Sequence, residues 1–355
     1  LSSFESLQQK FGHLGTKALR CLPPETAHNF AAYFLKHPSS ILEVPVKKLT
    51  RSFNLETKLE KIGTLEHPIA LAAGFDKNAE MIPCLKSLGF SLLEVGAVTP
   101  KPQDGHKKPR LFRQEEQRTL INRMGFNNKG SGCIQSSLLA AGDLTRVGVN
   151  IGPNKTTPLD KALDDYINLL QSLRAPVAYF SVNLSSPNTA SLKSLCNADF
   201  VAQLAKNIKT DTDRCTKDIW VKLGPNLQRQ EFQKIIAALQ EHNYAGVILT
   251  NTYPVEKPHR GGLSGHSLLV ASTRALEWAH DVHKGQLPMI GVGGVFSGLD
   301  VFEKVIRGAS LVQIYTSLVY RGPFVVFEIL EELTDVLQNK GFYSLEEARG
   351  TFYEI

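Results

Sequence analysis

The sequence lacks the features that would identify a metal, disulfide or membrane-spanning protein. Its five cysteines are widely spaced and form no CxxC pair, which excludes zinc ribbons and clustered iron–sulfur motifs and indicates a reducing environment. At the positions where catalytic residues are expected it has no HxH pair and no clustered Asp or Glu, so no metal is expected. No apolar run approaches the ~18 residues of a membrane span. With 42% apolar and 21% charged residues, the 355-residue chain has a globular composition.

Positive charge is concentrated near the amino terminus. Residues 1–61 hold nine Lys and Arg against five Asp and Glu, so +4 of the net charge of +6 lies there. Apolar residues recur at helical spacing from Phe4 to Ala18 and, after Pro23-Pro24, from Ala27 to Phe34. Two short helices are predicted over residues 1–37, either as a basic cap or as an amphipathic hairpin on an anionic membrane surface. Because the chain begins at Leu1 rather than Met, removal of a targeting or anchor segment also stays open.

From residue 68 onward, short apolar runs alternate with helical patterns. The runs rich in β-forming residues lie near 68–73, 91–98, 146–151, 176–184, 219–223, 245–250, 288–293 and 310–315. Helical patterns lie between or after them, at 159–173, 200–208, 231–240, 273–283, 299–306 and 325–337. This alternation predicts parallel strands joined by crossover helices. The predicted α/β fold is a (β/α)8 TIM barrel over about residues 65–340, with a doubly wound open sheet as the competing prediction.

Small or polar residues follow every predicted strand. They are Gly74 to Lys77, Thr99, Asn150, Asn183, Lys222, Thr250-Asn251, Gly293-Gly294 and Tyr315-Thr316. Loops are polar in general, but the amides and lysines at these positions exceed what turns require. In a barrel the carboxyl ends of the strands meet on one face, where catalytic residues gather. This distribution favours the barrel over the open sheet.

Three uses can be compared for the glycine-rich segment Ile290-Gly-Val-Gly-Gly294. As a dinucleotide-binding loop it would need glycine at position 296, which is Phe, and it would open its domain rather than lie late in the chain. A glycine-rich loop on the seventh unit, paired with Tyr315-Thr316 on the eighth, instead matches the phosphate site of a barrel. A tight turn that needs glycine for its backbone geometry is the alternative.

Lys222 lies in an otherwise apolar strand, so its ammonium either reaches the barrel mouth or bears a large desolvation cost. Two uses stay open for it: a Schiff base with a substrate carbonyl, or a fixed positive charge beside a reduced flavin. The segment from Ser181 to Thr189 is the most polar strand end, and its amides suit the donor and acceptor edges of a heterocycle. Ser186 is a base or nucleophile candidate by location. The sequence places no His or Asp partner near it, so a hydrolase triad is not expected.

Six ordered segments closely resemble the class 2 dihydroorotate dehydrogenases, quinone-dependent and membrane-associated flavoenzymes of pyrimidine biosynthesis. The similarity runs from about Pro23 to Gly341 and rests on Leu71-Ala-Ala-Gly-Phe-Asp-Lys-Asn78, Val98-Thr-Pro-Lys-Pro-Gln103, Ile121-Asn-Arg-Met-Gly-Phe-Asn127, Val182-Asn-Leu-Ser-Ser-Pro-Asn-Thr-Ala190, Ile290-Gly-Val-Gly-Gly294 and Leu311-Val-Gln-Ile-Tyr-Thr316. The resemblance implies an amphipathic helical hairpin over residues 1–40 and an FMN-binding barrel over residues 41–355.

The resemblance also implies roles for individual residues. FMN would be held by Ala72, Ala73, Gly74, Gly96, Asn150, Asn183, Lys222, Thr250, Gly265, Gly294, Tyr315 and Thr316. Dihydroorotate or orotate would be bound by Lys77, Asn122, Gly125, Phe126, Asn183, Asn188, Asn251 and Thr252. Ser186 would be the base that takes the proton from substrate C5, with Thr189 and Phe126 in the proton relay, while a hydride passes from C6 to flavin N5. Lys222 would stabilise negative charge on the reduced flavin.

The resemblance further implies ubiquinone as electron acceptor, with His28, Arg113 and Tyr315 at the polar end of a hydrophobic tunnel formed by the amino-terminal helices. Those helices would contact the membrane surface, at the mitochondrial inner membrane, with the chain peripheral or anchored by a segment outside this sequence. No nucleic-acid partner is expected. The competing hypotheses are a class 1 enzyme that uses fumarate, disfavoured by Ser186 and the helical pair; a non-redox barrel with Lys222 as a Schiff-base lysine; and a membrane-peripheral binding module without catalysis.

Overall fold

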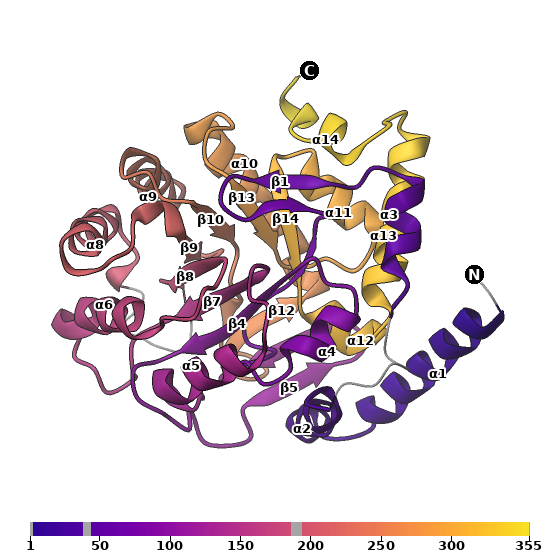
Figure 1. Ribbon diagram of the computed structural model, residues 1–355, viewed down its shortest axis with the longest axis horizontal. Coiled ribbons are helices and arrows are strands. Elements are labelled where there is room, and N and C mark those ends of the chain that lie inside the picture. The colour runs from indigo at the N-terminus through magenta and orange to yellow at the C-terminus, as the bar shows by residue number, and fades with distance from the viewer. Residues whose placement is uncertain (1–2, 38–43, 186–193, 355) are drawn as a thin grey trace.

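A closed barrel of eight parallel strands forms the centre of the computed structural model, which describes residues 3–37, 44–185 and 194–354 (Figure 1). In spatial order the strands are β10 (Gly246–Leu249), β13 (Met289–Val292), β14 (Ala309–Ile314), β3 (Ile69–Leu71), β4 (Leu92–Val98), β7 (Val147–Ile151), β8 (Tyr179–Asn183) and β9 (Ile219–Leu223). Seven of the predicted runs contain one of these strands, and the run 310–315 overlaps β14, which begins one residue earlier. The predicted barrel is therefore confirmed, and the open sheet is excluded.

Helices surround the barrel because each presents one apolar face to it (Figure 1). On α9 (Arg229–Glu241), for example, the buried residues Phe232, Ile235, Ile236 and Leu239 recur at helical spacing. The other outer helices are α4 (Ile82–Ser87), α5 (Gly130–Ala140), α6 (Ala162–Ser172), α8 (Ala198–Asp211), α10 (Leu269–His283), α11 (Gly298–Val305) and α13 (Val325–Asn339). All six helical patterns expected from the sequence correspond to helices, with ends that differ by a few residues.

The barrel interior is packed in layers. Along each strand alternate side chains point inward, as the period of two in a β-strand requires. Tyr179 and Trp220 fill the lower layer together with aliphatic side chains of the other strands. Two glycines provide the space, because a Cβ on Gly148 would lie 2.2 Å from the Tyr179 ring and one on Gly246 would lie 2.3 Å from the Trp220 ring. Aromatic and aliphatic side chains therefore fill the lower part of the barrel, near the amino ends of the strands, and the cavity lined by all eight strands lies at their carboxyl ends.

A second sheet, which the sequence did not predict, lies over the barrel mouth. It is antiparallel, in the order β11 (Tyr253–Val255), β12 (Gly261–Gly265), β6 (Thr119–Asn122) and β5 (Leu111–Gln114). Two loops far apart in sequence form it, since Asn122 of β6 pairs with Gly262 of β12. The remaining elements are α3 (Val46–Ser52), α12 (Thr316–Arg321), α14 (Leu345–Ala348), the hairpin β1 (Thr57–Leu59) and β2 (Gly63–Leu65), and the 3-10 turns η2 (Leu159–Lys161), η3 (Thr216–Asp218), η4 (His266–Leu268) and η5 (Thr351–Tyr353).

Two amino-terminal helices, α1 (Ser3–Arg20) and α2 (Pro24–Leu35), lie against one side of the barrel (Figure 1). Helix α1 packs on α12, and α2 packs on β5. Their outer faces remain apolar and exposed, with Phe11 and Leu14 each 63% exposed and Tyr33 64% exposed. Within the described residues, no helix is both long and apolar enough to cross a bilayer. Exposed apolar area of this kind is typical of surfaces that bind a protein, a membrane or a ligand.

Candidate functional site

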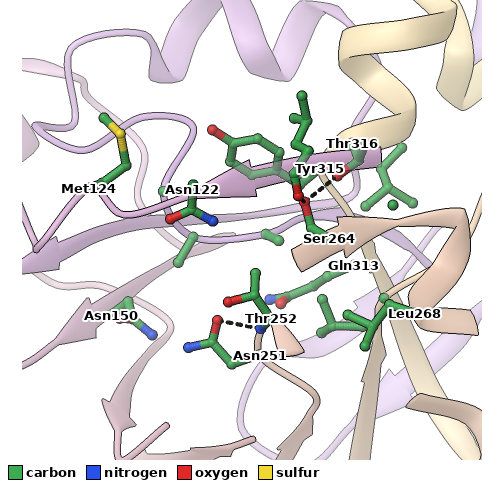
Figure 2. A pocket seen from close by; sticks show the side chains of 18 of the residues that line it. Asn122, Met124, Asn150, Asn251, Thr252, Ser264, Leu268, Gln313, Tyr315 and Thr316 are labelled. Carbon is green, nitrogen blue, oxygen red and sulfur yellow. Dashed lines mark hydrogen bonds between the residues drawn. The ribbon is translucent and has the colours of Figure 1, made fainter. Parts of the chain in front are cut away.

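A cavity opens at the carboxyl ends of the barrel strands, below the antiparallel sheet (Figure 2). Its walls contain residues from every barrel strand or the loop that follows it, as in other barrels of this architecture. The residues selected from the sequence that line it are His28, Ala72, Ala73, Gly74, Lys77, Gly96, Asn122, Gly125, Phe126, Asn150, Asn183, Lys222, Thr250, Asn251, Thr252, Gly265, Gly294, Tyr315 and Thr316. Residues dispersed over most of the chain thus meet at one site.

Of the four remaining predicted residues, one lies outside this cavity and three fall outside the part of the chain that the structure describes. Arg113 of β5 belongs to a neighbouring cleft between α2 and β5, where its guanidinium donates to the backbone carbonyls of Arg20 and Leu22. Ser186, Asn188 and Thr189 lie outside the described residues. Their roles therefore stay predictions.

Three asparagine side chains form a hydrogen-bonded chain in the cavity wall. Asn183 donates through Nδ2 to Oδ1 of Asn150 at 3.0 Å. Asn251 donates to the Ser185 hydroxyl at 3.0 Å and to Oδ1 of Asn183 at 3.4 Å. Asn251 also accepts from the backbone N–H of Thr252 at 2.7 Å, as Figure 2 shows. Because each amide is held by its neighbours, the donors and acceptors facing the cavity have fixed positions.

Lys77 brings a positive charge to the cavity from the loop after β3. The loop is fixed by Asp76, whose carboxylate accepts the backbone N–H groups of Asn78, Glu80 and Met81 at 3.3, 3.0 and 2.8 Å. Lys77 lines the cavity, and burial lowers the pKa of its ammonium to about 8. A lysine in such a position binds a carboxylate well, because the anion replaces the solvation that the protein withholds.

Helix α2 contributes His28 to the same cavity. Its ring packs edge-on against Phe75 at 5.4 Å, and Phe75 packs similarly against Tyr315 at 5.7 Å. Desolvation, together with the charge of Lys77, lowers the pKa of His28 to about 3, so the imidazole is neutral near pH 7. Burial also raises the pKa of Tyr315 to about 12. The side of the cavity nearest α2 therefore presents aromatic rings and the neutral imidazole of His28, next to the carboxylate of Glu25, which is paired with Arg110.

Another part of the cavity wall has the shape of an anion cradle. Gly294 has φ +79° and a Cβ there would lie 2.3 Å from the backbone of Leu269, while a Cβ on Gly265, with φ +99°, would lie 2.3 Å from the carbonyl of Arg118. The Thr316 hydroxyl donates to Ser264 at 2.9 Å (Figure 2). Within the described part of the chain, the buried Ser317 hydroxyl has no hydrogen-bond partner. A bound phosphate requires backbone that approaches it closely and hydroxyl groups that can donate hydrogen bonds to it.

Sequence reasoning missed two polar residues below this cavity. Glu94 of β4 is fully buried in the barrel, with Lys222 Nζ at 3.7 Å from its Oε1 atom. Gln313 of β14 is also fully buried; it donates to Glu94 and lines the cavity (Figure 2). The signal in the sequence was a lone carboxylate in the apolar run Leu92–Val98, the same kind of signal that had singled out Lys222.

A parallel barrel with a charged and amide-rich cavity at its strand ends, and with an apolar helical pair beside it, is typical of enzymes that bind their ligands at the carboxyl-end face of a barrel. The family model described as dihydroorotate dehydrogenase matches residues 54–337. The chain therefore belongs to the dihydroorotate dehydrogenase family, whose members are flavin-dependent oxidoreductases.

Individual relatives agree with this assignment. The dihydroorotate dehydrogenase (quinone) of Shewanella loihica is 38% identical over 90% of this chain and 98% of the relative. That of Gloeobacter violaceus is 41% identical over 83% of this chain and 85% of the relative. Among solved structures, a ligand-free DHODH from Eimeria tenella is 30% identical, with a TM-score of 0.85 over 94% of this chain and 100% of the other.

Proposed function

We propose that this protein oxidises dihydroorotate to orotate, with FMN as prosthetic group and ubiquinone as electron acceptor, in de novo pyrimidine biosynthesis. The observation that carries the proposal is the meeting, in one cavity, of residues from segments between His28 and Thr316 that the family resemblance had assigned to cofactor, substrate and acceptor. The name "dihydroorotate dehydrogenase (quinone)" of the curated relatives supports it.

The residues present fit FMN. The cradle at Gly265, Gly294 and Thr316 would hold its phosphate, and the free buried Ser317 hydroxyl adds a donor there. Ala72, Ala73, Gly74, Gly96, Asn150, Asn183, Lys222, Thr250 and Tyr315 would surround the ring system. When bound, FMN supplies the hydride acceptor and the link to a quinone. The protein supplies orientation and charge: Lys222 places a positive group beside the cofactor.

The substrate position lies between Lys77 and the asparagine chain. The Lys77 ammonium would bind the carboxylate of dihydroorotate, and Asn122, Asn183, Asn188, Asn251 and Thr252 would hold its ring amides, with Gly125 and Phe126 alongside. Ser186 would remove the C5 proton, and Thr189 and Phe126 belong to the proposed relay. Because a serine hydroxyl is a weak base in water, this step requires a site closed to bulk solvent.

The quinone would approach past the amino-terminal helices. His28 and Tyr315 offer neutral hydrogen-bonding groups on the aromatic side of the cavity, and Arg113 lies in the adjoining cleft. The exposed apolar faces of α1 and α2 would contact the membrane that holds the quinone. This gives residues 1–40 the role of an access hairpin and residues 41–355 that of the FMN barrel. Location at the mitochondrial inner membrane is a prediction from the resemblance, whereas the curated relatives compared above are bacterial.

Anaerobic titration of the purified protein with dihydroorotate tests this function. The protein should be yellow, dihydroorotate should bleach the flavin absorbance, and a short-chain ubiquinone should restore it while fumarate does not. Restoration by fumarate would instead indicate a class 1 enzyme. A colourless protein that releases no FMN on denaturation would refute the redox function and favour Lys222 as a Schiff-base lysine.

A further inference from the structure

Glu94 is the most deeply placed charged group beneath the cavity. It lies in β4, two residues after the inward-facing Leu92, so its side chain also points into the barrel. It is 0% exposed. Burial of a carboxylate costs free energy unless its oxygens accept hydrogen bonds, so the neighbours of Glu94 must provide donors.

Four neighbouring groups donate to this carboxylate. Asn150 Nδ2 and the Ser181 hydroxyl reach Oε1 at 2.9 and 3.0 Å, whereas the Tyr179 hydroxyl and Gln313 Nε2 reach Oε2 at 2.8 and 2.6 Å. Burial, together with the charge of Glu94, raises the pKa of Tyr179 well above its usual value, which keeps that hydroxyl a donor. A carboxylate met only by donors in this way acts as an acceptor at both oxygens.

The carboxylate fixes the direction of the asparagine chain. With Nδ2 of Asn150 bound to Glu94, Oδ1 of Asn150 must face Asn183, and it accepts Nδ2 of Asn183 at 3.0 Å. That leaves Oδ1 of Asn183 to accept from Ser185 and Asn251. A reversed Asn150 would turn its carbonyl oxygen toward the carboxylate, so the whole chain has one favourable orientation.

Gln313 is oriented in the same manner. Its Nε2 donates to Glu94, and its buried Oε1 has no hydrogen-bond partner among the described residues although the side chain lines the cavity. A fixed acceptor without a partner in a cavity wall is a group prepared for a ligand donor. Glu94 thus determines which polar atoms Asn183, Asn251 and Gln313 present.

Glu94 also faces Lys222, whose Nζ lies 3.7 Å from Oε1 with its side chain only 5% exposed. The negative charge partly offsets the positive charge that Lys222 places beside the cofactor position. In a low-dielectric interior, removal of one member of such a pair changes the field at the cavity strongly.

We infer that Glu94 is a positioning residue: it orients the amides that read the pyrimidine ring and moderates the charge of Lys222 beneath the flavin. The inference rests on the proposed function and adds to it a residue that touches neither ligand. By this inference, Glu94 influences both the affinity for substrate and the reduction potential of the cofactor.

Glu94→Gln tests this in the intact, FMN-loaded protein. Glutamine keeps the shape but removes the charge, and it can accept at one end only. We expect the dissociation constant of orotate, measured from the flavin spectrum, to rise at least tenfold. The equilibrium ratio of reduced to oxidised flavin at a fixed potential should also rise about tenfold, which is a midpoint shift of about +30 mV for a two-electron couple.

Tyr179→Phe is the matched control. It removes one donor to the same carboxylate from the solid lower layer of the barrel, and it leaves both the charge and the asparagine chain in place. Orotate affinity and midpoint potential should stay within twofold and about 10 mV of the unmodified protein. If Glu94→Gln behaves like Tyr179→Phe in both measurements, Glu94 only stabilises the fold and the inference is wrong.

Ser181→Ala provides the decision if Glu94→Gln does not fold. Ser181 donates to Glu94 and accepts from Asn150 at 2.6 Å, so its loss loosens the first amide of the chain. Weaker orotate binding by at least threefold, with Tyr179→Phe unchanged, supports the inference; equal affinities in both variants overturn it. A failure of the proposed function is distinct, because the unmodified protein would then hold no FMN or bind no orotate.

Discussion

The pKa of Lys77 leads to a prediction about substrate binding and pH. Desolvation lowers that pKa to about 8 in the free protein, and a bound carboxylate would raise it again. Binding therefore takes up a proton above pH 8 but not below it. The affinity for orotate should be constant below about pH 7 and fall as pH rises through 8, by about tenfold between pH 8 and pH 9.5, because only protonated Lys77 attracts the carboxylate.

The measurement is the dissociation constant of orotate from pH 6.5 to 9.5, followed through the absorbance of the bound flavin. Lys77→Met is the reference, because the ligand and all other residues ionise as they do in the unmodified protein and only the lysine is missing. Its affinity should be weaker by about 1.5–3 kcal/mol at pH 7, the usual contribution of a hydrogen bond to a charged group. The ratio of the two constants should shrink steadily above pH 8. A ratio independent of pH would refute the assignment of Lys77 to the carboxylate.

Four further outcomes are expected. Burial lowers the pKa of Lys304 to about 7 from 10.5, so the folded protein binds fewer protons than the unfolded chain between these values and its stability rises with pH there. Denaturant unfolding at pH 7 and pH 9 should show this gain of about 2 kcal/mol in the unmodified protein and its absence in Lys304→Met. Gly294→Ala places a Cβ against the backbone of Leu269 and should lower the FMN content measured on denaturation to well below one per chain. Deletion of residues 1–37 should impair ubiquinone reduction far more than flavin reduction by dihydroorotate in stopped-flow assays, whereas equal losses would mean that the helices only support the barrel. Ser186→Ala should retain FMN and lose at least a hundredfold of the dihydroorotate-driven reduction rate; an unchanged rate would remove Ser186 as the base.

The barrel was predictable because its signal is local. A buried parallel strand is a short apolar run, and the crossover helix after it has apolar residues at helical spacing, so each unit can be recognised alone. Strands β11, β12, β5 and β6 gave no such signal. They have three to five residues each, several are only partly buried, and their pairing joins Asn122 to Gly262 across the chain. The stabilising partner of such a strand is unknown until the fold is known.

The site shows the same limit. Residues at strand ends were predictable, since the parallel barrel brings all carboxyl ends to one face. Glu94 was not selected, because its meaning depends on groups that four other strands supply, among them Lys222, Asn150 and Gln313. Arg113 was assigned to the tunnel by resemblance, yet its contacts are with the carboxyl end of α1, a detail that only the packing of the helices determines.

The aromatic layer of Tyr179 and Trp220 has a kinetic consequence. Because these rings fill the lower part of the barrel, the proposed pyrimidine and quinone substrates and their products would all enter and leave at the carboxyl-end face. Two chemically different substrates can then react with one cofactor only through separate entrances on that face or by binding one after the other. Parallel double-reciprocal plots of the steady-state rate, obtained when both substrates are varied, would indicate that the substrates bind one after the other.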